Sequence, residues 1–263
     1  MERVLILKDG GLVEVGKNRG IVLEVDDVER VVAAAEMVER ENSLFCVKLH
    51  VKQEITEIAF REEWQRIPLV VYPAGLGAVR DLIGLLPLLK KLNVKFFFDS
   101  ALGHSYEAVQ ILSSLGIYSG IWINERADWE KLTDLMYYAL CGKVVHAPIE
   151  PFQYLYDVYE RNRLVDYGGV FFEDGEVFEV LTAKNEGMFK VFDTEHTEEA
   201  QRSTEKNWQR FFYEATPCAA CPGWRICMGK YANMKDKTPC QSFTTELLNL
   251  IETIKLRNLR IKN

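Results

Sequence analysis

The sequence predicts an α/β fold in which a partial, open (β/α)6 TIM-like barrel, residues 1–165, precedes a smaller cysteine-rich domain, residues 166–263. Short apolar runs alternate with longer amphipathic segments through the first range, and the runs are continuous and rich in Val, Ile and Phe. Such runs are typical of parallel strands that are buried on both faces. After residue 166 the sequence becomes more polar and its cysteines cluster, which predicts the second domain.

The elements of the first domain follow one another as about six βα units across residues 18–165. A segment before them, VLILKDGGLVEV, predicts a hairpin that turns at Gly10-Gly11. The predicted strands are GIVLEV, LFCVKLHV, IPLVVYPAG, VKFFFDSA, YSGIWIN and KVVHAPIEP. The predicted helices are DDVERVVAAAEMVEREN, with Asp26 or Asp27 as its N-cap, and residues 78–92, 104–115, 127–140 and 152–163. A complete barrel needs eight units and about 250 residues, so six units predict a partial barrel; a doubly wound open sheet is the alternative, because spacing alone does not separate the two.

The second domain is predicted to contain a hairpin, a helix and a long final helix. The hairpin is GGVFFEDGEVFEVL, which turns at Asp174-Gly175 and alternates apolar residues on both arms. A polar stretch then becomes helical over about residues 197–213. The cysteine segment follows, and an amphipathic pattern predicts the last helix over residues 242–258.

Composition and charge exclude several classes of function. Hydrophobic residues make up 48% and charged residues 27% of the chain, which is ordinary for a globular protein. The net charge of −7 argues against a general nucleic-acid or anionic-membrane surface. No apolar run approaches the roughly 20 residues of a membrane span, and no signal peptide is recognisable. We therefore expect a cytoplasmic protein, in which clustered thiols bind metal or do redox work more often than they form disulfides.

Four cysteines near the C-terminus have the spacing of a metal centre. Cys218 and Cys221 form a C-x2-C pair, Cys227 follows on the next turn of chain, and Cys240 completes the set. Prolines and glycines beside them restrict the backbone or allow it to wrap around a metal. Four thiolates suit tetrahedral Zn²⁺ or a [4Fe-4S] cluster, and the spacing does not decide between the two.

The hairpin VFFEDGEVFEV, the polar stretch and CAACPGWRIC with its distal cysteine resemble the SPASM domain. This domain is the C-terminal extension of radical S-adenosylmethionine (SAM) enzymes that mature peptides and sulfatases. The resemblance implies a [4Fe-4S] cluster, with Zn²⁺ as the alternative, ligated by Cys218, Cys221, Cys227 and Cys240. The family has a further cysteine at the position of Tyr231, and residues 166–217 contain none. The resemblance therefore implies one cluster and the loss of the family's second one.

The first domain resembles the partial (β/α)6 barrel of radical SAM enzymes in its rhythm, but it lacks their C-x3-C-x2-C motif after the first strand. Cys46 and Cys141 are isolated and are interpreted as structural residues. Without the motif no SAM is expected to bind. The resemblance then implies an accessory protein of ribosomal-peptide maturation, which docks a precursor peptide or a partner maturation enzyme or relays an electron.

Polar residues follow the predicted strands and suggest an alternative function. They are His50, Asp99, Ser100, His104, Asn124, Glu125, His146 and Glu150. Chemistry in a βα protein belongs at the carboxyl ends of the strands, so His146, Glu150 and Asp99 are candidate catalytic residues of an enzyme in which the cluster is only structural. The alternative is that such residues cap the following helices, Asp99 or Ser100 the helix at 104 and Asn124 the helix at 127; capping does not explain His146 inside an apolar run, so His146 and Glu150 are the best candidate pair. A third interpretation is a binding module that is stapled by zinc.

Overall fold

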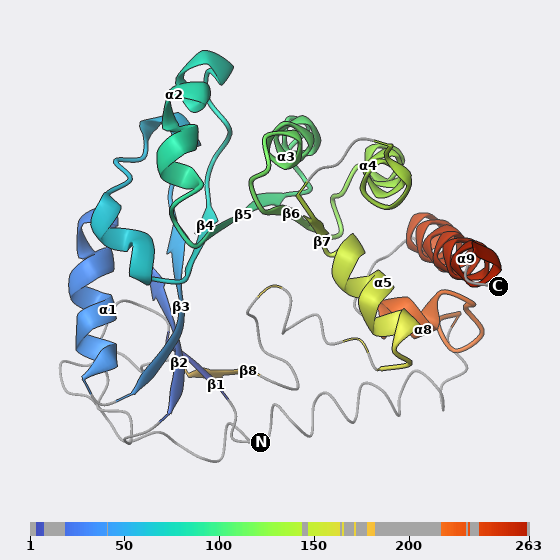
Figure 1. Ribbon diagram of the computed structural model, residues 1–263. Coiled ribbons are helices and arrows are strands. Elements are labelled where there is room, and N and C mark those ends of the chain that lie inside the picture. Colours follow the sequence, from blue (N-terminus) through green and yellow to red (C-terminus); the bar gives the residue numbers. More distant parts are fainter. Residues whose placement is uncertain are drawn as a thin grey trace. The chain divides into compact units, whose positions relative to one another are not determined.

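The computed structural model shows two compact units (Figure 1). It describes residues 4–7, 19–40, 42–143, 147–163, 165, 171, 178–181, 217–229, 231 and 237–261. Unit 1 comprises residues 1–123, 143–150 and 166–192, and unit 2 comprises residues 124–142, 151–165 and 193–263. The chain thus passes between the units several times, and the predicted ranges 1–165 and 166–263 do not coincide with them.

Unit 1 is built on a parallel sheet of eight strands. The strands are β1 (Val4–Leu7), β2 (Gly20–Val25), β3 (Ser43–His50), β4 (Leu69–Tyr72), β5 (Val94–Asp99), β6 (Ser119–Trp122), β7 (Ile149–Glu150) and β8 (Phe178–Leu181). They are arranged in the order β7-β6-β5-β4-β3-β2-β1-β8. From β1 to β7 each strand therefore pairs with the next one along the chain, without the reversal that defines a doubly wound sheet. The predicted α/β class and the parallel sheet are confirmed.

Helices α1 (Val31–Glu39), α2 (Val79–Leu89) and α3 (Ser105–Ser114) lie along one side of this sheet (Figure 1). A short helix, η1 (Val28–Arg30), leads into α1, and the carboxylate of Asp27 caps it by accepting the N–H of Glu29 at 3.0 Å. Between β3 and β4 the crossover consists of two 3-10 helices, η2 (Ile55–Glu57) and η3 (Glu62–Arg66), instead of an α-helix. The predicted helices at 78–92 and 104–115 are confirmed as α2 and α3.

The core of unit 1 lies between the sheet and these helices. Alternate strand residues face it and are almost completely buried, among them Leu23, Val47, Leu69, Phe96 and Ile121. The ring of Phe96 packs edge-on against Phe60, which in turn contacts Trp64 of η3. The intervening residues of each strand face the other side of the sheet, and several of them are charged or aromatic.

Unit 2 is a group of helices that pack around the last one. Helices α4 (Trp129–Cys141), α5 (Phe152–Glu160) and α8 (Trp224–Cys227) all contact α9 (Thr238–Ile261). The ring of Phe243 on α9 packs against Trp129 and Phe152. Two hydroxyls fasten the helix further along: Tyr137 donates to Glu246 at 2.8 Å and Tyr159 donates to Glu252 at 2.6 Å.

Several predicted elements can be compared with the chain only in part. The hairpin turn at Gly10-Gly11, the turn at Asp174-Gly175 and the helix over residues 197–213 lie outside the described residues. The last helix begins at Thr238, four residues before its predicted start at Ser242. The difference arises because Pro239 lies in the first turn of this helix, where proline is tolerated, so the helix begins before the amphipathic pattern does.

Candidate metal centre and strand-end residues

Three of the four clustered cysteines lie on consecutive tight turns of unit 2. The N–H of Cys221 donates to the carbonyl of Cys218 at 3.2 Å, and the N–H of Trp224 donates to the carbonyl of Cys221 at 3.0 Å. Helix α8 then ends at Cys227, where Met228 adopts a left-handed conformation with φ of 49°. The turns therefore present the three thiols within one short, wrapped segment.

The segment is fixed against the first turns of α9, which carries the fourth cysteine. Gly223 touches Thr244 so closely that an added Cβ would lie 2.1 Å from the Thr244 hydroxyl oxygen. The amide of Gln241 donates to the carbonyl of Pro217 at 3.3 Å. The hydroxyl of Thr244 donates to the carbonyl of Cys240 at 2.8 Å. These contacts bring Cys240 to the segment that holds the other three thiols.

Burial and the charges of neighbouring thiols act on Cys227 and Cys240. Cys218, Cys227 and Cys240 are 8%, 9% and 5% exposed, and Cys221 is half-buried. Burial raises the pKa of Cys227 to about 11, and the charges of Cys240 and Cys218 add to the rise. Burial also raises the pKa of Cys240, followed by the charges of Cys218 and Cys221. The sulfurs of Cys218, Cys221 and Cys240 thus each lie close enough to another thiol of the set to affect its ionisation.

Some backbone groups already favour the thiolate form. The N–H groups of Tyr231 and Gly229 donate to the sulfur of Cys227 and lower its pKa against the effect of burial. Hydrogen bonds of this kind are a typical outer shell of sulfur ligands. The sequence prediction had assigned Tyr231 only as the site of a lost cysteine. Its backbone contact with Cys227 was missed, although the glycine two residues after Cys227 indicated a tight turn at this point.

The residues fit a four-thiolate centre by donor type, but the ligand shell is not closed. All six cysteines of the chain are free thiols. Among the residues that the structure describes, which include the four clustered cysteines, no group of three or more His, Cys, Asp or Glu side chains is arranged to hold a metal ion. The four sulfurs therefore lie near one another, and they would have to move closer together to coordinate one metal ion or cluster.

The predicted strand-end residues have varied local partners. The carboxylate of Asp99 accepts the N–H of Ala101 at 2.8 Å, which is a turn-forming role. Asn124 does the same for the N–H of Arg126 at 2.9 Å. His104 bonds to the carbonyl of Ala74 at 2.9 Å, and the ring of His50 stacks on Tyr72 with centroids 4.5 Å apart.

Of the two candidate catalytic residues that the structure describes, Glu150 is more enclosed than Asp99. It is 8% exposed, and the hydroxyl of Tyr118 donates to its carboxylate. In the sheet Glu150 pairs with Gly120, which pairs with Phe97, so Asp99 lies two residues further along β5 than the level of Glu150. His146 lies outside the described residues, and its candidate catalytic role stays a prediction.

The sheet face opposite α1–α3 carries a charged and aromatic band that the sequence analysis missed. Lys48 pairs with Glu24 at 2.8 Å, and the ammonium of Lys95 lies 4.4 Å from the centre of the Tyr118 ring. Glu24, Lys48, Val70 and Lys95 occupy one register across β2, β3, β4 and β5, so these side chains share a face. The signal was present in the sequence as single lysines inside otherwise apolar strands, which had been interpreted as buried on both faces.

None of the helices described by the structure is long and apolar enough to cross a membrane. Comparisons of the chain with protein-family models, with curated protein sequences and with solved structures found no match.

Proposed function

We propose that this chain is an iron–sulfur protein that binds one [4Fe-4S] cluster through Cys218, Cys221, Cys227 and Cys240, and that it acts as an accessory factor in ribosomal-peptide maturation. It would dock a precursor peptide or a partner maturation enzyme, or relay an electron. The observation that carries the proposal is the packing of the turn that holds Cys218, Cys221 and Cys227 against the first turns of α9, which carry Cys240. A single Zn²⁺ in the same ligand set is the alternative.

The surroundings of the thiols support a bound cation. Burial and mutual repulsion disfavour several thiolates together, and a metal ion or cluster removes both penalties because it supplies the missing positive charge. Burial raises the pKa of Cys240, and the charge of Lys237 and the backbone N–H of Gln241 act against this rise. The N–H donors of Tyr231 and Gly229 favour a thiolate at Cys227. A cluster with four protein thiolates supplies electron transfer or structural support rather than an open iron for substrate.

The strand order supports the proposed relationship to partial βα barrels. Strands β1–β7 follow the chain, and β8 pairs with β1 on its other edge. This is the cyclic order of a (β/α) barrel that is open between β7 and β8. The predicted six βα units correspond to β2–β7 with their crossovers. Because the sequence lacks C-x3-C-x2-C, we propose no SAM chemistry for this barrel.

Metal analysis of anaerobically purified protein tests the proposal. We expect a brown protein with broad absorption at about 400 nm and about four irons per chain, as for a [4Fe-4S] centre. Cys218→Ala should lose the colour because it removes a buried ligand. Cys141→Ala, at the exposed end of α4, is the matched control and should keep it. A colourless protein with one zinc, or a Cys218→Ala variant that stays brown, contradicts the proposal.

A second candidate function is an enzyme whose site lies on the sheet of unit 1, with Glu150, Asp99 and His146 as its acid–base groups. The partly buried hydrogen bond between Tyr118 and Glu150 favours it, because a buried carboxylate held by a hydroxyl suits proton transfer. Glu150→Gln keeps the shape of the side chain and removes its charge. Cells whose only copy of this protein is the Glu150→Gln variant should no longer form the product of the proposed enzyme. The purified variant should still contain its metal. Full product formation by a folded Glu150→Gln protein contradicts this function.

A further inference from the structure

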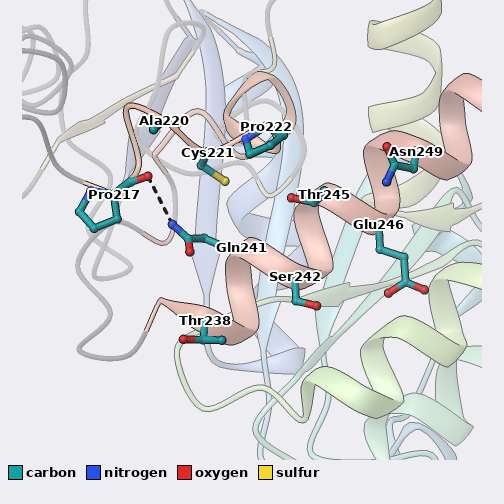
Figure 2. A pocket seen from close by; sticks show the side chains of 10 residues that line it. All are labelled: Pro217, Ala220, Cys221, Pro222, Thr238, Gln241, Ser242, Thr245, Glu246 and Asn249. Atoms are coloured by element: carbon teal, nitrogen blue, oxygen red, sulfur yellow. Dashed lines mark hydrogen bonds between the residues drawn. The ribbon is translucent and has the colours of Figure 1, made fainter.

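A groove of about 540 Å³ lies beside the cysteine segment in unit 2 (Figure 2). One wall is the turn Pro217–Pro222, and the other is a stripe along α9 (Figure 2). Its lining residues are Pro217, Ala220, Cys221, Pro222, Thr238, Gln241, Ser242, Thr245, Glu246 and Asn249. The groove is therefore an open trough between a rigid, proline-bounded turn and a single helix.

The length of the helical wall limits what the groove holds. Its residues recur at intervals of three or four between Thr238 and Asn249, which places them on one side of α9. At a rise of about 1.5 Å per residue this stripe is roughly 16 Å long. An extended polypeptide rises about 3.3 Å per residue, so the stripe matches a segment of about five residues.

The chemistry of the lining suits a peptide backbone. The trough is lined by hydroxyl groups of Ser242 and Thr245 and by the amides of Gln241 and Asn249, of which Gln241 donates one N–H to the carbonyl of Pro217. The single ionisable carboxylate in the lining is Glu246, and no lysine, arginine or histidine is among these residues. The hydroxyl of Tyr137 donates to Glu246 and fixes its direction. An extended segment with free N–H and C=O groups and neutral or basic side chains fits this polarity.

We propose that this groove binds an extended peptide segment of about five residues, neutral or basic, alongside Cys221. Cys221 is the most exposed of the four clustered cysteines, and Figure 2 shows its sulfur directed toward α9 across the groove. The groove is thus the side on which the thiol cluster is nearest to the surface. The groove would be the peptide-docking site of the proposed function. Peptide binding in the groove does not require a metal, whereas the placement of the peptide beside a cluster rests on the proposed metal centre.

Selection from a displayed library of random heptapeptides tests the inference, with the anaerobically purified full chain as target. The dissociation constant of each enriched peptide is then measured by fluorescence anisotropy on three variants. Ser242→Trp fills the groove from an exposed position and should weaken binding by about tenfold or more, as expected for a blocked contact. Asn249→Lys should weaken basic peptides by a similar factor, because it adds a like charge. Leu256→Trp, on the same helix and 60% exposed, lies beyond the groove and should leave binding unchanged.

The outcomes separate this inference from the proposed metal function. Enriched peptides that bind wild type and Leu256→Trp equally but lose affinity for Ser242→Trp support the groove, provided that Ser242→Trp keeps the absorption of the wild-type protein. The inference is overturned if no peptide is enriched, or if Ser242→Trp binds enriched peptides as wild type does. A colourless chain that still shows the groove-dependent binding refutes the cluster and leaves the peptide site standing.

Discussion

Replacing Gly223 by alanine adds a methyl group to the contact that holds the cysteine segment against α9. The added Cβ would lie 2.1 Å from the hydroxyl oxygen of Thr244, 2.5 Å from its Cβ and 2.8 Å from its backbone carbonyl carbon. The closest of these distances is roughly 1 Å short of ordinary van der Waals contact. Because one of the three atoms belongs to the backbone of α9, a side-chain rotation of Thr244 does not relieve the overlap, and the turn has to move away from the helix.

We expect two measurable consequences of Gly223→Ala. Overpacking of this kind costs about 1–3 kcal/mol, which should lower the melting temperature of the protein. The displacement also separates Cys221 and Cys227 from Cys240 by roughly 1 Å, whereas metal–sulfur distances are held to within about 0.2 Å. The metal content of the variant should therefore fall much more than its helical content, measured by metal analysis and circular dichroism on the same preparation.

Gly84→Ala is the matched control for this experiment. Gly84 lies inside α2, and a Cβ added there meets nothing within 4 Å. Alanine is favoured over glycine in a helix by about 1 kcal/mol, so this variant should be slightly more stable and should bind metal as wild type does. If Gly223→Ala binds the same amount of metal at an unchanged melting temperature, the contact with Thr244 does not position the ligands.

Three further predictions concern unit 1. Gly120→Ala should destabilise the protein by about 1–3 kcal/mol in urea unfolding, because the added Cβ would lie 2.6 Å from the Phe97 ring. Lys48→Met should cost about 3–5 kcal/mol because it leaves the carboxylate of Glu24 without its ammonium partner, and Lys48→Met/Glu24→Gln should recover part of this loss; an additive double variant would contradict the pairing. Burial raises the pKa of Cys46 to about 12. Between about pH 9 and pH 12 the unfolded chain therefore loses the thiol proton while the folded protein keeps it. The stability that this thiol contributes is thus present below about pH 9 and is lost as the pH rises toward 12. Cys46→Ala should reduce this alkaline loss in melts across the same pH range, and rapid alkylation of Cys46 in the folded protein at pH 8 would refute its burial.

The parallel sheet could be predicted from the sequence because its strands are buried between chain crossovers, which leaves a local pattern of apolar runs. The charged and aromatic band on the opposite face of the sheet could not be predicted in the same way. Lys48 and Lys95 are single charges in apolar runs, and their partners Glu24 and Tyr118 lie 24 and 23 positions away in sequence. Only the register of β2–β6 brings these groups together, and register between parallel strands is set by packing rather than by local sequence.

The division of the chain into the two compact units could not be predicted from local sequence patterns either. Helix α4 follows β6 as a crossover helix should, yet its Trp129 packs against Phe243 of α9. Helix α5 follows β7 and packs against the same side chain through Phe152. A periodic apolar face shows that a helix is buried but does not show which neighbour covers it, so the two helices were grouped with the strands that precede them.

The spacing of the four cysteines predicts one metal centre, which stays a prediction, and α9 shows how the positions of these residues depend on the rest of unit 2. Its first turn supplies Cys240, its second holds Gly223 through Thr244, and its later turns bond to Tyr137 and Tyr159 on α4 and α5. For the proposed metal site, closing the ligand shell and docking α9 on its neighbours would therefore be linked equilibria. Since a metal bound only by the folded form stabilises that form, metal should raise the unfolding midpoint of unit 2. Conversely, loosening α9 far from the thiols should weaken metal binding even though all four ligands remain.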